Sequence, residues 1–183
     1  EVVHADEVFE FDYDEAPWIP RCGGTLGVSV LKKVFWDDSN KFSLVNNGVE
    51  VRGNRSGHET VSPVQVGKFK TRIANTSAQF TKNKWLYSSA VQPFEGQKKV
   101  VFSDSGYAKP FYDASGEVAL GQHAKAFFVN NKDEADAIIA MAESKLMKFG
   151  ARSMLESSAA SNLSLMMHRL PIVKKKMTDQ ELY

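Results

Sequence analysis

Apolar residues recur every three or four positions between residues 132 and 149, which predicts one amphipathic helix there. Asn131 stands where an N-cap is expected, and Glu134, three residues later, completes a capping box. Gly150 predicts the end of the helix. The apolar stripe is typical of a helix that packs on a core, and it consists of Ala135, Ile138, Ile139, Ala142, Leu146 and Phe149.

Shorter β-prone runs predict strands in the rest of the chain. An apolar-rich run predicts a buried strand over 26–36, and similar runs predict strands over 98–103 and 124–129. Two pairs of runs flank turn residues and predict hairpins. The first hairpin joins 41–45 to 49–51 through Asn46-Asn47-Gly48, and the second joins 109–112 to 118–120.

Residues 68–80 alternate loosely between polar and apolar positions and predict one more strand. The alternation places Lys68, Lys70 and Arg72 on one face of this strand, opposite Phe69 and the apolar positions that follow it. Three cations on one face suit phosphate contacts, although a sheet face that only meets solvent gives the same pattern. Residues 52–63 are polar and are expected to form a loop.

These elements together predict an α+β fold, with a mixed, mostly antiparallel sheet of hairpins packed by the C-terminal helix of 132–149. Residues 1–20 carry seven acidic residues and no Lys or Arg, and they predict an acidic arm or edge strand. We therefore expect an arm over 1–20 and a domain over 21–183. The chain begins without an initiator Met, which suggests a piece of a longer polypeptide.

Charge is distributed unevenly along the chain, although the net charge is only +1. Residues 52–99 carry nine Lys and Arg residues against two Glu residues, which favours an anionic partner such as nucleic acid. No apolar run reaches the roughly 18 residues of a membrane span, and the N-terminus lacks a signal-peptide pattern. We expect a soluble cytoplasmic protein with no membrane partner.

Catalytic and metal-binding motifs are not found in the sequence, so we assign no catalytic, metal or cofactor residue. Its one cysteine and four widely spaced histidines do not form a short-range metal motif. The Gly-rich run 22–27 precedes an expected strand, whereas a dinucleotide-binding turn follows one, so we interpret its glycines as turn residues. Asp37 and Asp38, followed by Glu50-Val51-Arg52, faintly resemble a nuclease motif, which leaves a metal-dependent nuclease as an alternative. A protein-interaction module with an incidental basic face is the third possibility.

Residues 98–183 resemble the C-terminal target-recognition domain of adenine-specific DNA methyltransferases from type II restriction–modification systems of bacteria. Three ordered stretches carry the resemblance. They are KVVFSDSGYAKPFYD at 99–113, FFV at 127–129 with the helix ending in ESKLMKF at 143–149, and LPI at 170–172 with the closing MTDQELY at 177–183. In the closing segment, Met177 replaces the tryptophan of the family pattern. No stretch of residues 1–97 carries the resemblance.

The resemblance implies that this chain grips double-stranded DNA. A catalytic domain of the same polypeptide would bind S-adenosylmethionine and the flipped adenine. The alternative is a fused restriction–modification enzyme with the same division of labour. Our own inference from the residues is that the candidate DNA contacts are Arg52, Arg55, Lys68, Lys70, Arg72, Lys82, Lys84, Ser103, Ser105, Tyr107 and Lys109. Among them, Arg52 and Arg55 are expected to read guanine edges, and Lys68, Lys70 and Arg72 to contact phosphates.

Overall fold

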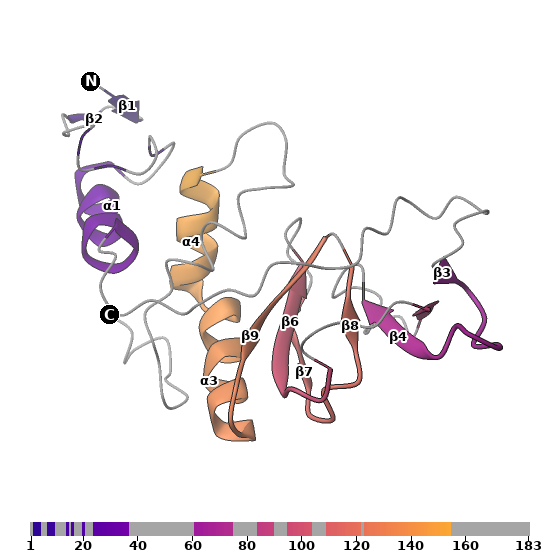
Figure 1. Cartoon of the computed structure of the whole chain (residues 1–183). Coiled ribbons are helices and arrows are strands. Elements are labelled where there is room, and N and C mark those ends of the chain that lie inside the picture. Colours follow the sequence, from indigo (N-terminus) through magenta and orange to yellow (C-terminus); the bar gives the residue numbers. More distant parts are fainter. Residues whose placement is uncertain are drawn as a thin grey trace.

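The computed structural model describes residues 2–4, 7–9, 14, 16, 20, 24–36, 61–74, 84–89, 95–103, 109–121 and 123–154. In these ranges, helices lie on one side of a three-stranded sheet, and a four-stranded sheet lies on the other side (Figure 1). Pairing between the described strands is mostly antiparallel. This is the α+β fold that the sequence predicts.

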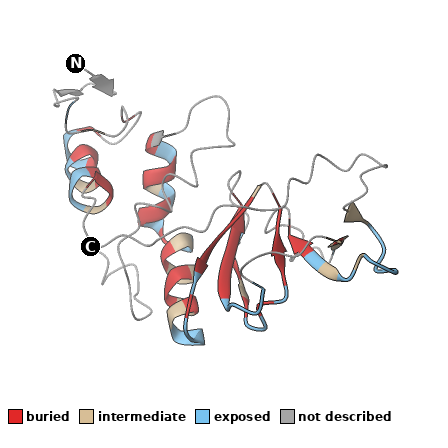
Figure 2. Cartoon of the chain, in the orientation of Figure 1, coloured by how far each residue is buried: buried red, intermediate tan, exposed pale blue. Residues whose placement is uncertain are grey.

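The central sheet separates two apolar clusters. Its strands, in the order β7-β6-β9, are Phe111–Asp113, Lys99–Ser103 and Ala124–Phe128, all antiparallel. Alternation along β6 turns Val100 and Phe102 toward the helices and Val101 toward the second sheet. The middle strand is therefore buried on both faces, as Figure 2 shows.

Four helical segments contribute residues to the first apolar cluster, and α3 among them lies directly against the central sheet (Figure 1). They are α1 (Gly24–Leu31), the π-helix η1 (Lys32–Trp36), α3 (Lys132–Glu143) and α4 (Lys145–Met154). The rings of Phe102 and Phe127 stack within this cluster, with centroids 5.4 Å apart. The predicted apolar stripe of the C-terminal helix packs here, with Ala135, Ile138 and Leu146 buried.

The second sheet packs on the opposite face of the central sheet. Its order is β3-β5-β4-β8, formed by Val61–Ser62, Leu86–Ser88, Thr71–Ala74 and Ala119–Leu120. Ala74 joins the second apolar cluster, and the ring of Trp85 meets Phe111 edge-on at 6.1 Å. A separate antiparallel pair, β1 (Val2–His4) with β2 (Glu7–Phe9), lies within the acidic segment 1–20.

The strand predicted over 26–36 is wrong, because the structure forms α1 and η1 there. The buried positions Val28, Leu31 and Phe35 are three and four residues apart, as on a helix, whereas Leu26 is 79% exposed. A short apolar run fits a buried strand or a helix equally well by composition. The predicted turn at 22–27 is wrong from Gly24 onward, since Gly24 opens α1.

The single helix predicted over 132–149 is two helices, which break at Ser144 and continue past Gly150 to Met154. Ser144 has an extended ψ of 158°, and its hydroxyl oxygen accepts the N–H of Met147 at 3.1 Å. Ser144 is therefore an N-cap for α4 in the middle of the predicted helix. The amphipathic stripe continues across the break, so periodicity alone did not reveal it.

Pairing of the shorter strands also differs from prediction. The hairpin predicted from 109–112 and 118–120 does not form, because β7 pairs with β6 whereas β8 pairs in parallel with β4 of the other sheet. Val61–Ser62 forms β3, although 52–63 was predicted as a loop. The hairpin predicted around Asn46-Asn47-Gly48 lies outside the described residues.

We expect Asn131→Ala to lower the free energy of unfolding by about 1 kcal/mol in urea denaturation. The side chain of Asn131 accepts the N–H of Glu134 at 2.9 Å, and the Glu134 carboxylate accepts the N–H of Asn130 at 2.8 Å. The alanine variant leaves the first of these donors without its acceptor. Asn131→Asp keeps the acceptor and should retain stability, so an equal loss in both variants would contradict the capping role.

Candidate nucleic-acid interface

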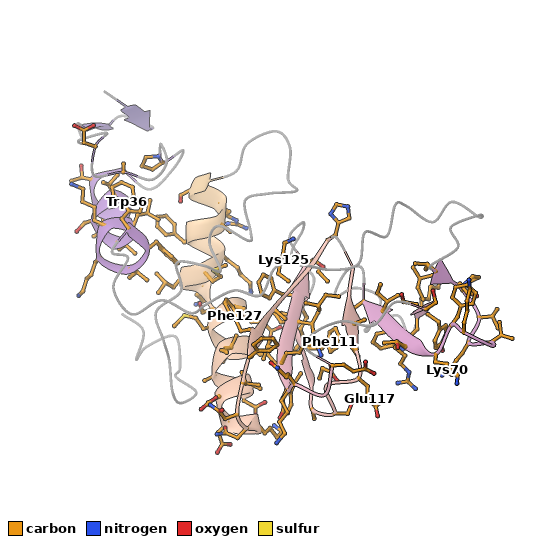
Figure 3. All side chains as sticks on the ribbon, viewed as in Figure 1. Trp36, Lys70, Phe111, Glu117, Lys125 and Phe127 are labelled. Carbon is orange, nitrogen blue, oxygen red and sulfur yellow. The ribbon has the colours of Figure 1, made fainter. Side chains whose placement is uncertain are left out.

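Exposed cations lie in and next to strands β4 and β5 of the four-stranded sheet, in two segments that contain no acidic residue. The described segments 61–74 and 84–89 contain no Asp or Glu. Their four cationic side chains are all exposed: Lys68, Lys70, Arg72 and Lys84. Lys70 marks the outer end of this sheet in Figure 3, far from Trp36 at the helical end of the molecule.

Lys68 and Lys70 lie in a tight turn before β4, so the strand predicted from residue 68 begins later, at Thr71. Phe69 donates its N–H to the carbonyl of Val66 at 3.0 Å, and Gly67 supplies a φ of 57°. The Lys68 ammonium lies 5.4 Å from the centroid of the Phe69 ring. The predicted alternation persists through this turn, because Lys68, Lys70 and Arg72 are exposed and the residues between them are partly covered.

Arg72 lies in β4 among polar and aromatic side chains of the neighbouring strands. Its cross-strand partner is Tyr87 on β5, and Tyr87 in turn pairs with Ser62 on β3. Because side chains directly opposite each other share a face, these three form one row across the sheet. Trp85 lies two residues before Tyr87 on the same face, and the Arg72 guanidinium carbon is 5.8 Å from its ring centroid.

We define the basic face as Lys70, Arg72, Ser62, Trp85 and Tyr87. Trp85 and Tyr87, which are both half-buried, were not among the residues predicted from the sequence. The sequence did contain a signal for them: Trp85 and Tyr87 follow Lys84 and are two residues apart, a spacing that places both rings on one face of a strand. The same alternation along β5 puts Lys84 on the opposite face.

Two further predicted contacts that the structure describes, Ser103 and Lys109, belong to the central-sheet side of the molecule and not to the basic face. Ser103 is 1% exposed on the central strand β6, so its hydroxyl is not available to a duplex, and this assignment is corrected. Lys109 lies beside the central sheet and forms an exposed ion pair with Glu143 of α3 at 3.2 Å. The other predicted contacts lie outside the described residues: Arg52, Arg55, Lys82, Ser105 and Tyr107.

A buried ion pair joins β6 and β7 of the central sheet, next to the turn after β7. The Lys99 ammonium is fully buried and donates to the Asp113 carboxylate at 2.7 Å and to the Gly116 carbonyl at 3.2 Å. The same carboxylate accepts the N–H groups of Gly116 and Val118 at 3.1 and 3.0 Å. Both charges are therefore compensated. The Asp113 carboxylate also fixes the backbone between β7 and β8, so we assign the pair a structural role.

Metal-binding groups of three or more His, Cys, Asp or Glu side chains do not occur among the described residues. The acids of the alternative nuclease motif, Asp37, Asp38 and Glu50, fall outside those residues, as does Arg52. None of the described helices has the length and apolar character needed to cross a membrane.

Comparison with known protein families, curated proteins and solved structures found no match to this chain. The resemblance of residues 98–183 to a target-recognition domain stays a prediction. The candidate function is therefore argued from the charge, exposure and register of the basic face.

Proposed function

We propose that this chain recognises double-stranded DNA on behalf of an adenine-specific DNA methyltransferase or a fused restriction–modification enzyme. A catalytic domain of the same polypeptide would bind S-adenosylmethionine and carry out methyl transfer. The chain itself supplies affinity and orientation on the duplex, and it holds no catalytic residue in this proposal.

The observation that carries the proposal is the group of exposed cations Lys68, Lys70 and Arg72, in a segment that contains no acidic residue. A cation that contacts phosphate releases counterions, and this supplies much of the affinity of a protein for DNA. An acid among those cations would repel the phosphates, so its absence from 61–74 and 84–89 matters. The sequence resemblance supports the same class of partner independently of this surface.

Strand geometry fits a duplex as the partner. Arg72, Tyr87 and Ser62 lie side by side across three strands, and Lys70 lies in the turn just before β4. The major groove is about 12 Å wide and admits a two-stranded β-ribbon, and several DNA-binding proteins read bases with side chains on strands. Lys68 and Lys70, on the turn beyond the strand, are then placed to reach phosphates at the groove edge.

We expect the double variant Lys68→Glu/Lys70→Glu to bind random duplex DNA about 10- to 100-fold more weakly at low salt, because two phosphate contacts become repulsive. The slope of log affinity against log salt concentration should fall by about one for each lysine lost. Fluorescence anisotropy of a labelled random duplex, with the full chain and a salt titration, measures both quantities.

The matched control is Lys33→Glu/Lys148→Glu, which makes the same charge change at two exposed helical positions. The control should bind nearly as well as the original chain. An equal loss in both double variants would remove the basic face from the interface. No retention of duplex DNA by the unaltered chain, even at low salt, would overturn the proposed function.

A further inference from the structure

Arg72 differs from the other cations of this sheet because an aromatic ring supports it. The guanidinium carbon lies 5.8 Å from the centroid of the Trp85 ring, within the range of a cation–π contact. No carboxylate or carbonyl among the described residues hydrogen-bonds the guanidinium. Its N–H groups are therefore held beside an aromatic surface and are not used by the rest of the described chain.

This arrangement suits recognition of a flat, two-acceptor edge. Arginine carries its N–H groups in a planar fork, which matches two neighbouring acceptors at once. A side chain that already rests on a ring loses less conformational freedom on binding than one that moves freely. Lys70, by contrast, presents a single compact charge with no such support, as suits a phosphate.

We propose that Arg72, supported by Trp85, reads the major-groove edge of a guanine through its O6 and N7 acceptors. The duplex contacted is the one assigned under the proposed function, so the inference rests on that function and adds a specificity-determining residue to it. It replaces the expectation that Arg72 contacts only phosphate. Arg52 and Arg55, the arginines expected to read bases, lie outside the described residues.

Arg72 lies on β4, an inner strand of the four-stranded sheet, and its row also contains Tyr87 and Ser62. Tyr87, directly opposite Arg72, is half-buried, and no hydrogen bond of its hydroxyl occurs among the described residues. Ser62, the next member of the row, uses its hydroxyl locally, donating to the carbonyl of Val64 at 2.8 Å and accepting its N–H at 3.0 Å. Arg72 and Tyr87 are thus the polar groups of the row that remain available to bases.

The test begins by selecting bound sequences from a random duplex pool with the full chain, which gives a preferred site. Arg72→Lys keeps the charge and removes the fork. We expect it to reduce the preference for guanine over adenine at one position by roughly 5- to 150-fold. Affinity for the random pool should fall much less than this preference, because the positive charge and hence the phosphate term persist. Replacing that guanine by 7-deazaguanine, which lacks the N7 acceptor, should weaken the original chain and have little effect on Arg72→Lys.

Two variants of Trp85 distinguish loss of the ring under Arg72 from general damage to the fold, and a variant of Lys70 tests the phosphate contact. Trp85→Phe keeps a ring under Arg72 and should retain the preference, whereas Trp85→Leu should reduce it in the same direction as Arg72→Lys. Lys70→Ala should weaken all sequences alike. A uniform loss in Arg72→Lys, or an unchanged guanine preference, would overturn this inference while leaving DNA binding intact. Failure of the unaltered chain to retain any duplex would instead overturn the proposed function.

Discussion

Replacing Asp113 by alanine is expected to lower the free energy of unfolding by about 3–5 kcal/mol, because it leaves the buried Lys99 charge without its counter-ion. Lys99 is 0% exposed, so water cannot replace the lost carboxylate. The variant also removes the acceptor for two buried backbone donors, the N–H groups of Gly116 and Val118. Urea denaturation followed by tryptophan fluorescence and circular dichroism measures the change.

We expect replacement of Lys99 and replacement of Asp113 to reduce stability by different amounts. Lys99→Met should cost less than Asp113→Ala, because the remaining carboxylate still accepts the N–H groups of Gly116 and Val118 and the Ser115 hydroxyl. This second variant also gives a measurement if Asp113→Ala does not fold. An exposed pair serves as control, since Asp136→Ala removes the partner of Lys132 where water screens both charges. A loss in Asp136→Ala as large as that in Asp113→Ala would contradict the importance of burial.

The second large effect is expected at Gly116, where alanine should lower the free energy of unfolding by about 2–5 kcal/mol. About 1–2 kcal/mol comes from the left-handed backbone, whose φ is 74°, and about 1–3 kcal/mol from overpacking. An added Cβ would lie 2.3 Å from the Gly96 carbonyl carbon and 2.6 Å from the Gln97 nitrogen. Both contacts are with backbone atoms, so no side-chain rotation relieves them.

Gly67 provides the matched control for this prediction. Its φ of 57° is also left-handed, but an added Cβ would meet nothing within 4 Å. Gly67→Ala should therefore carry only the backbone strain of about 1–2 kcal/mol. The same denaturation assay compares the two. If both glycine variants lose the same stability, the close approach of Gly116 to residues 96 and 97 does not constrain the chain in solution.

These two positions also affect the candidate interface, although neither lies on it. The carboxylate of Asp113 and the packing of Gly116 direct the chain out of β7 toward β8. β8 pairs with β4, the strand that carries Arg72. Variants that disturb this turn are expected to weaken duplex binding indirectly, together with stability. Lys68→Glu/Lys70→Glu should weaken binding while stability stays nearly constant, which distinguishes the two causes.

Burial also shows which residues of the stretch 99–113 stabilise the fold. Within KVVFSDSGYAKPFYD, the two terminal residues Lys99 and Asp113 form the buried ion pair, and Val100, Val101 and Phe102 fill both apolar clusters. Ser103 ends the same buried strand. The buried residues in the described part of this stretch therefore stabilise the fold and are not exposed to a partner. For that reason the DNA contacts are assigned to the other sheet, where the cations are exposed.

The sequence by itself determined the features that depend on near neighbours in the chain. Asn131 and Glu134 predict where α3 begins, since capping involves residues three or four apart. The strands at Lys99–Ser103 and Ala124–Phe128, and the exposure of Lys68, Lys70 and Arg72, follow equally from local patterns. Each of these depends on periodicity within about ten residues.

The tertiary structure alone decided which segments meet. Pairing of β8 with β4 brings together residues more than 40 positions apart, and nothing local specifies it. Residues 24–36 are helical because the core accepts Val28, Leu31 and Phe35, which lie on one side of a helix, and leaves Leu26 exposed. The support of Arg72 by Trp85 required the antiparallel register of β4 and β5. Such contacts are set by burial of apolar surface across the whole domain, which a single stretch of sequence does not contain.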